Sequence, residues 1–308
     1  MKTSFHTRIL HWLLLLPVVS TLSCEKNFNI ELDTAPQLLI VEGYINNEIP
    51  EYNYVVLTRS QNYYAPDFQS LAVTNATVTV TEGTLLPDQT YSWDPATKVQ
   101  LREASQPQIP DSLRQGVYFD PRLFTSPAQA LRGTTGKYYL LEIEKDGMHY
   151  SSVTGLLQPV ILDSISSGYH FNDAEDGNKP KAKITACYQD PDTIGNTQMY
   201  FWRYEANRNN FGWAGLSRNR RADGADDLIN GQYIKLTQNQ AFAIGDTVSY
   251  FLVSVERKVY NFWESYDKAR DNEGPFATPV TLQNTISGEN VLGCFSGFSI
   301  SSRRSVIQ

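Results

Sequence analysis

The stretch best suited to binding chemistry lies between residues 207 and 232, where aromatic, basic and acidic side chains follow one another. Exposed aromatic rings can stack on sugar rings or peptide side chains, and guanidinium groups can clamp carboxylates or phosphates. The alternative is that Trp213 packs onto a sheet while the arginines pair with neighbouring acids. The sequence predicts a candidate ligand or partner contact formed by Phe211, Trp213, Arg218, Arg220 and Arg221.

A second aromatic candidate is the pair Tyr63 and Tyr64. Tyr52 and Tyr54 are close by in the sequence. Cross-strand packing explains such a group of rings as well as ligand contact does, so both interpretations stay open.

The acidic residues Asp223, Asp226 and Asp227 are weak candidates for a metal site. Hard cations such as calcium prefer several oxygen ligands, but the spacing does not reproduce the calcium loop of about twelve residues. A solvated turn is therefore favoured, and the sequence predicts no bound metal and no cofactor.

Catalysis by histidine is disfavoured, because only His149 and His170 lie outside the first 23 residues. A Ser-His-acid triad would need one of them, and zinc sites use more nitrogen or sulfur donors. The sequence names no catalytic residue and favours a protein that is not an enzyme. A glycan hydrolase that uses a carboxylate pair stays open, although nothing selects a pair from the 33 acidic residues.

The charge balance excludes some partners. The formal net charge is −7, and residues 1–23 contribute Lys2 and Arg8 but no acid. Because an acidic surface repels phosphates, we expect no nucleic-acid partner.

The amino terminus has the three-part layout of a secretory signal, with Lys2 and Arg8, the apolar run Ile9–Val19 and a small-residue end before Cys24. The run of about 11 residues is too short to cross a bilayer, which takes about 20. Cys24 after Leu-Ser resembles a bacterial lipobox of the looser kind that Bacteroidota lipoproteins tolerate. We expect a signal peptide over 1–23, lipid on Cys24 and a tether over 24–37. The alternative is an ordinary secreted protein.

Strand signals dominate the rest of the chain. Alternation over Ala76–Thr81 predicts a half-buried strand, and Asp146-Gly147 between two apolar runs predicts a two-residue hairpin turn. The stretch Glu103–Thr135 lacks periodicity and is expected to be a long excursion between strands. Further strands are expected at 38–45, 54–58, 181–189, 198–207, 232–237 and 246–257.

One segment has helical periodicity. Val259, Phe262, Trp263, Tyr266 and Ala269 recur at spacings of three and four, which predicts an amphipathic helix over 258–270. An aromatic stripe of this kind is more often a cover for a core than a ligand site.

The pattern as a whole predicts a mostly β protein with two β-sandwich, immunoglobulin-like domains and one short amphipathic helix in the C-terminal half. Gln158-Pro159 suggests a boundary between an N-terminal domain, 38–157, and a C-terminal domain, 158–308. Cys187 and Cys294 lie in apolar strand-like runs and are predicted to be buried free thiols, with pairing left open.

Several motifs together resemble a Bacteroidota family called domain of unknown function 4249. They are Leu39–Ile45, Leu57–Ser60 with Tyr63-Tyr64, Lys137–Ile143, Tyr200–Tyr204, Asp226-Asp227, Gly274–Pro279, Asn284–Ile286 and Leu292–Phe295. Members look like cell-envelope lipoproteins, often encoded beside TonB-dependent outer-membrane transporters. The resemblance implies an outer-membrane-anchored accessory or binding lipoprotein that works with such a nutrient transporter, and it carries over no catalytic residues. A structural or adhesive surface lipoprotein is the other alternative, and the membrane face stays open.

Overall fold

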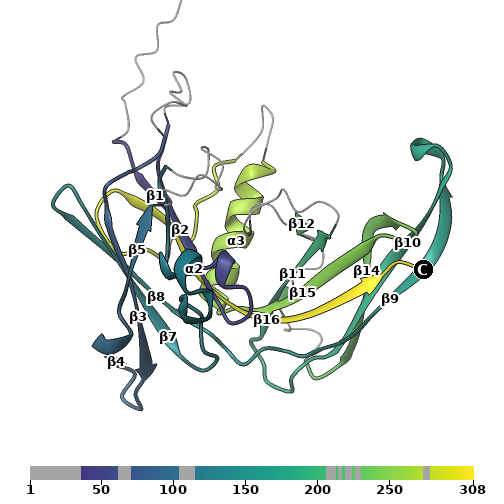
Figure 1. Cartoon of the computed structure of the whole chain (residues 1–308), viewed down its shortest axis with the longest axis horizontal. Helices are drawn as coiled ribbons and strands as arrows, with labels where there is room; N and C mark the ends of the chain where they lie inside the picture. The colour runs from purple at the N-terminus through teal and green to yellow at the C-terminus, as the bar shows by residue number, and fades with distance from the viewer. Residues whose placement is uncertain are drawn as a thin grey trace, which may run out of the picture. The chain divides into compact units, whose positions relative to one another are not determined.

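The computed structural model describes residues 36–61, 71–103, 115–205, 213, 217–218, 224–225, 230–272 and 278–308. The architecture is mostly β, with packed sheets and one longer helix, which confirms the predicted fold class (Figure 1). The predicted signal peptide and Cys24 lie outside the described residues, as does most of the predicted tether.

The strands are β1 (Leu39–Asn46), β2 (Tyr54–Arg59), β3 (Thr77–Leu85), β4 (Tyr91–Trp93), β5 (Val99–Glu103), β6 (Val117–Phe119), β7 (Tyr138–Lys145), β8 (Met148–Gly155), β9 (Leu162–Asp173), β10 (Lys179–Gln189), β11 (Thr197–Tyr204), β12 (Ser217–Arg218), β13 (Gly224–Ala225), β14 (Tyr233–Ala243), β15 (Thr247–Ser254) and β16 (Val291–Val306). The helices are α2 (Arg122–Thr125) and α3 (Arg257–Arg270), with 3₁₀ turns at Pro50–Tyr52, Pro95–Thr97, Pro127–Gln129 and Ala174–Asp176.

Among the described residues, thirteen strands form one sheet and three form a second. The main path of the large sheet is β12-β11-β15-β16-β1-β2-β6-β5-β3-β7-β8, with β13 paired to β11 and β4 to β3. The small sheet has the order β14-β10-β9. All pairs are antiparallel except β1 with β16, which is parallel.

Strand β16 joins the two halves of the chain. Residues 291–298 pair with β1, and residues 299–306 pair with β15. In Figure 1 this strand, drawn in yellow, runs through the middle of the large sheet. The predicted domain boundary at residues 157 and 158 falls between β8 and β9 and stays a prediction. Because β16 pairs with strands from both halves of the chain, both halves contribute to the large sheet.

Side chains alternate between the two faces of each central strand, and both faces are buried because a core lies on each side. On β15, Phe251 and Val253 face the core beneath α3, whereas Tyr250 and Leu252 face the core shared with the small sheet. A third core lies where β3, β7 and β8 pack against β1 and β2. The large sheet therefore packs against α3 and against the small sheet, and its own strands pack against one another in the third core.

The predicted hairpin and helix are confirmed. Asp146 and Gly147 have φ angles of 52° and 77° and link β7 to β8, the left-handed pair that a tight hairpin turn requires. Helix α3 spans Arg257–Arg270 and buries Val259 and Phe262. Lys268 and Arg270 lie in its last turn, where positive charge stabilises the helix dipole.

The stretch predicted as a long excursion differs from the prediction. Its described part contains β6, whose three side chains are buried and which pairs with β2 and β5. A strand of three residues is too short to show a periodic pattern in the sequence, so it is recognised only from its pairing with β2 and β5. No described helix combines the length and the apolar character needed to cross a membrane.

The parallel pair β1–β16 depends on Gly293. This residue has φ +155°, and a Cβ atom there would lie 1.9 Å from the carbonyl oxygen of Val41. The Asn284 side-chain oxygen accepts a hydrogen bond from the Gly293 amide at 2.9 Å, which fixes the local backbone.

Gly293→Ala is expected to destabilise the protein by at least about 1–3 kcal/mol, because the clash is with backbone and not with a flexible side chain. Chemical denaturation measures the change. Gly168→Ala in β9 is the matched control, since a Cβ there meets nothing within 4 Å. Equal stability of the two variants would contradict the prediction.

Candidate functional site

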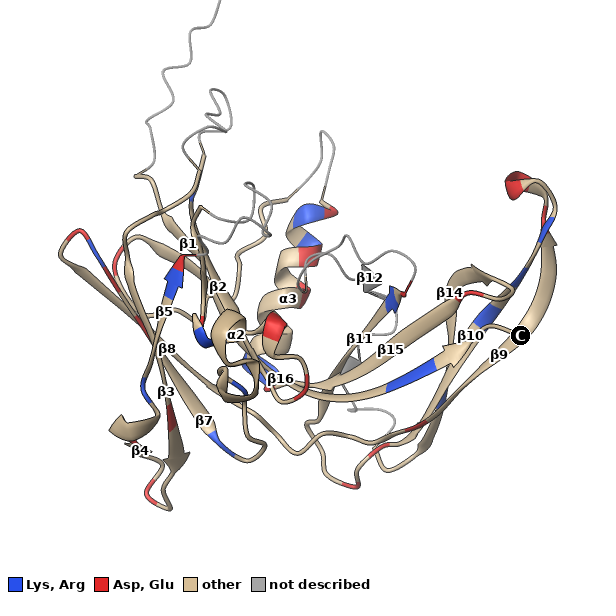
Figure 2. Ribbon diagram, viewed as in Figure 1, with Lys and Arg blue, Asp and Glu red and all other residues tan. Residues whose placement is uncertain are grey.

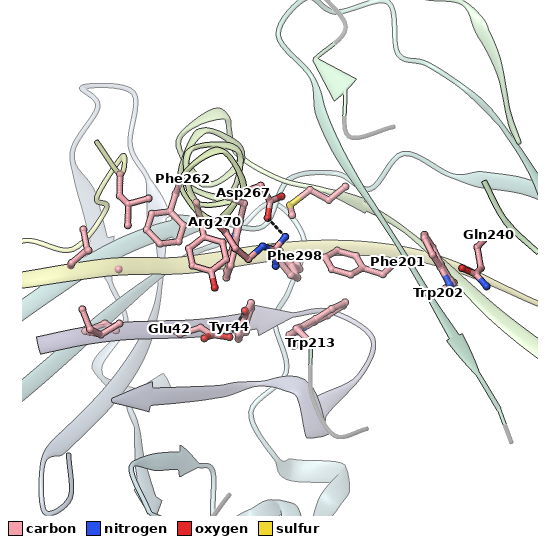
Figure 3. Close-up of a pocket in the computed structure, with 18 residues that line it drawn as sticks. Glu42, Tyr44, Phe201, Trp202, Trp213, Gln240, Phe262, Asp267, Arg270 and Phe298 are labelled. Carbon is pink, nitrogen blue, oxygen red and sulfur yellow. Dashed lines mark hydrogen bonds and ion pairs between the residues drawn. The ribbon is translucent and has the colours of Figure 1, made fainter. Parts of the chain in front are cut away.

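A pocket of about 800 Å³ lies between α3 and strands β1, β11 and β16 (Figure 3). Most of its lining is apolar, and eight of the lining residues are aromatic. A volume of this order with few polar groups is typical of small-molecule sites. The aromatic members are Tyr44, Phe201, Trp202, Trp213, Phe262, Trp263, Tyr266 and Phe298.

The rings hold one another in fixed orientations. Tyr44 and Trp263 stack with 6.1 Å between ring centroids and 11° between planes. Trp213 meets Phe298 edge to face at 4.8 Å. The Trp263 indole nitrogen donates a hydrogen bond to the Ser296 hydroxyl at 3.0 Å, so the position of its ring is set from β16.

Helix α3 contributes both to the core and to the pocket. Val259 and Phe262 are buried in the core beneath it, and Phe262 also lines the pocket. Trp263 and Tyr266, the next members of the aromatic stripe, line the pocket as well. Trp263 also packs against the core, so the stripe both covers the core and lines the pocket.

Glu42 is the carboxylate on the strand side of the pocket. It lies on β1 opposite Cys294 of β16 and Val56 of β2, and it is partly buried. The Tyr44 hydroxyl donates a hydrogen bond to its Oε1 atom at 2.6 Å. Burial raises the pKa of the Glu42 carboxyl, and this hydrogen bond only partly opposes the shift.

The pKa of the Tyr44 hydroxyl is shifted by the same burial. Burial raises the pKa of its hydroxyl well above the usual value, and the negative charge of Glu42 raises it further. Tyr44 is therefore a hydrogen-bond donor at neutral pH, and its ring is a fixed part of the pocket wall.

The last turns of α3 supply the other charged lining groups. Asp267 and Arg270 form an ion pair at 3.0 Å, drawn as a dashed line in Figure 3. The Arg270 guanidinium also lies 5.6 Å from the centroid of the Tyr266 ring. Figure 2 shows positive and negative residues side by side in these turns. Charge at this end is thus compensated within the helix.

Trp202 and Gln240 lie apart from the other labelled side chains in Figure 3. Trp202 belongs to the core shared with the small sheet, and Gln240 is exposed on β14. The Trp202 indole nitrogen is buried and finds no hydrogen-bond acceptor among the described residues.

Of the residues predicted from sequence to contact a ligand, Trp213 lies at the pocket. It is 3% exposed, its amide donates to the Tyr54 hydroxyl at 3.0 Å, and its indole nitrogen donates to the Tyr52 carbonyl at 3.2 Å. It packs onto the sheet, as the alternative interpretation stated, and it also lines the pocket.

Arg218 lies in β12, paired with Phe201 of β11, and only its backbone is described. The remaining candidates lie outside the described residues, namely Phe211, Arg220, Arg221, Tyr63, Tyr64, Asp223, Asp226 and Asp227. Within the described part of the chain, no three His, Cys, Asp or Glu side chains gather as metal ligands would.

Four further pocket residues are not among the ligand contacts predicted from the sequence, namely Glu42, Tyr44, Trp263 and Arg270. A usable signal was present: Glu42 is an acid inside the apolar run Leu38–Ile45, where a buried carboxylate needs an explanation. The convergence of this strand with α3 was not visible in the sequence, because the two are over 200 residues apart.

The two described cysteines are free thiols on different sheets. Cys294 is buried, as predicted, and burial raises the pKa of its thiol to about 11. Cys187 on β10 is partly exposed, in contrast to the prediction, because its side chain points to the outer face of the small sheet.

Glu42→Gln is expected to raise the melting temperature of the ligand-free protein at pH 7. Because the carboxyl pKa is raised on folding, the folded state is most favoured while Glu42 is protonated, and that stability is lost as pH rises through the raised pKa. Glutamine keeps the shape and an acceptor for Tyr44 but cannot ionise.

The difference from wild type should shrink below the usual glutamate value of about 4.5. Thermal unfolding from pH 4 to pH 8 measures it, with exposed Glu289→Gln as the control. A difference that does not grow with pH would count against this prediction.

The chain matches the family model described as "Domain of unknown function (DUF4249)" over residues 25–304. Among solved structures it is similar to a two fibronectin type-III domain segment from chicken tenascin, with 10% identity, coverage of 71% of this chain and 89% of that chain, and a TM-score of 0.18. No curated protein matches it. Because the family model spans nearly the whole sequence after Cys24, the protein belongs to the DUF4249 family.

Proposed function

We propose that this protein is a binding lipoprotein of a Bacteroidota cell envelope, anchored at the outer membrane through Cys24 and working with a TonB-dependent nutrient transporter. The single observation that carries the binding role is the aromatic pocket of about 800 Å³ beneath α3. Its size suits one small, largely apolar ligand.

Hydrogen bonds around α3 support a preformed pocket. At the start of the helix, the Glu256 carboxylate accepts a hydrogen bond from the Gly155 amide at 2.9 Å, which ties α3 to the end of β8. Farther along, the Ser265 hydroxyl accepts from the Gln283 amide at 3.0 Å. The first contact holds the helix to the sheet and the second holds Gln283 to the helix, so the ligand need not order these parts of the pocket wall.

The proposed anchor rests on the signal-like segment before Cys24 and on the family resemblance. Acyl chains would contribute about 0.8 kcal/mol per buried methylene, so several chains would hold the protein at a membrane without a spanning helix. The first described strand begins at Leu39, which leaves the predicted tether of residues 24–37 between the lipid and the sheets.

The binding role is tested with 2-phenylethanol, a neutral water-soluble probe. We expect saturable binding to the full chain in detergent micelles, roughly in the millimolar range for so small a ligand. Leu282→Trp adds an indole to a half-buried lining position and should weaken binding by at least about tenfold.

Isothermal titration calorimetry measures the affinity, with empty micelles as the blank. Leu86→Trp makes the same substitution at a position that is 38% exposed and should leave binding unchanged. Binding that survives Leu282→Trp would place the probe outside the pocket and contradict the proposal.

Anchoring and partnership are tested together by mild detergent extraction of membranes and affinity isolation. The wild-type chain should fractionate with the outer membrane and co-isolate a transporter-sized protein. Cys24→Ser should move it to the soluble fraction, because the acylated thiol is gone. Cys187→Ser is the control. Reproducible recovery without such a partner would count heavily against the transporter role, and unchanged fractionation of Cys24→Ser against the anchor.

A further inference from the structure

We infer that the pocket beneath α3 selects organic cations, namely an ammonium group carried on an apolar body, with Glu42 as the counter-ion. This inference rests on the proposed binding role of the same pocket and adds the chemical class of the ligand.

Glu42 differs from two other buried acids of this protein, which form ion pairs with arginine. Asp120, with 4% of its side chain exposed, pairs with Arg122 at 2.8 Å. Glu205, with 9% exposed, pairs with Arg203 at 3.2 Å. Among the side chains that the structure describes, Glu42 has no cationic partner, and the Tyr44 hydroxyl is its hydrogen-bond donor.

A partly buried carboxylate without a counter-charge is unfavourable, because the hydrogen bond from Tyr44 replaces only part of the hydration that burial removes. The raised pKa of Glu42 reports this imbalance. An ammonium group placed in the pocket would supply the missing charge and charge-assisted hydrogen bonds to the carboxylate. The ligand would then complete an ion pair that the fold leaves half-formed.

The rings next to Glu42 favour the same ligand. Tyr44 places its ring beside the carboxylate through their hydrogen bond, and Trp263 stacks on that ring. The Tyr44 ring is buried among other rings, whereas Trp263 is partly exposed, and the face of a tryptophan ring attracts cations by about 0.5–2 kcal/mol depending on desolvation. The remaining aromatic lining suits an apolar body attached to the charged group.

An anionic ligand would find no equivalent partner among the described lining residues. Arg270 is the single basic residue in that lining, and its guanidinium already pairs with Asp267 and lies over the Tyr266 ring. Glu42 would repel a carboxylate or phosphate. The net charge of −7 also favours the approach of cations over anions.

Three probes of similar shape test the inference on the full chain in micelles: 2-phenylethylammonium, 2-phenylethanol and 3-phenylpropionate. In the wild-type protein at pH 7, the ammonium compound should bind at least about tenfold more tightly than the alcohol, and the carboxylate more weakly than both. This comparison needs no variant, so it does not depend on how a substituted chain folds.

Glu42→Gln should reduce the preference for ammonium over alcohol to about twofold or less, because the neutral glutamine cannot act as a counter-ion. Glu289→Gln, an exposed acid remote in sequence from β1, should retain the wild-type preference. Calorimetry provides both affinities, and the unfolding transition of each variant confirms that it is folded.

The outcomes separate the two proposals. If the alcohol binds in the pocket but the ammonium compound binds no more tightly, or if Glu42→Gln keeps the full preference, the cation inference is overturned and the binding role stands. If none of the three probes binds, both are overturned.

Discussion

The parallel pairing of β1 with β16 is the constraint on which the rest of the structure depends. It places Leu39–Asn46, the first described strand, against Val291–Phe298 near the end of the chain. The close approach of the Gly293 backbone to Val41 makes this register possible, because no side chain would fit between them. Both strands line the pocket, so the site exists only when the ends of the sequence have met. Pairing over such a sequence separation is slow in folding, because the entropy of closing the long loop is lost before the contact forms.

Burial on both faces explains why one sheet can carry three cores. Strands such as β15 alternate between two apolar environments, which removes the polar face that antiparallel strands usually present to water. On β1 the alternation directs Val41 and Ile45 to one core and Tyr44 to another, beneath α3. Glu42 lies on the α3 side, next to the rings. The packing of α3 on the sheet therefore partly buries any side chain at position 42, including an acidic one.

The sequence predicted features that are encoded locally. The Asp146-Gly147 turn and the helix near Arg257–Arg270 were both found, because positive-φ turns and a 3.6-residue period are properties of neighbouring residues. The full length of β16 was not predicted, since its serine-rich second half looks polar until β15 covers it. The pocket was missed for the same reason: Glu42 and Trp263 acquire a shared role only through tertiary packing.

Glu42 is better explained by ligand binding than by a contribution to the stability of the fold. If the acid served packing alone, an apolar residue on β1 would fill the space without the cost of burying a charge. If it served a structural ion pair, an arginine would be expected beside it, as Arg122 lies beside Asp120. Neither holds among the described residues, whereas two rings of the same pocket, Tyr44 and Trp263, are held in place by stacking and by the Trp263–Ser296 hydrogen bond. A carboxylate without a cationic partner that lines a preformed aromatic pocket suits a ligand of opposite charge, because binding then requires little rearrangement and removes an existing penalty.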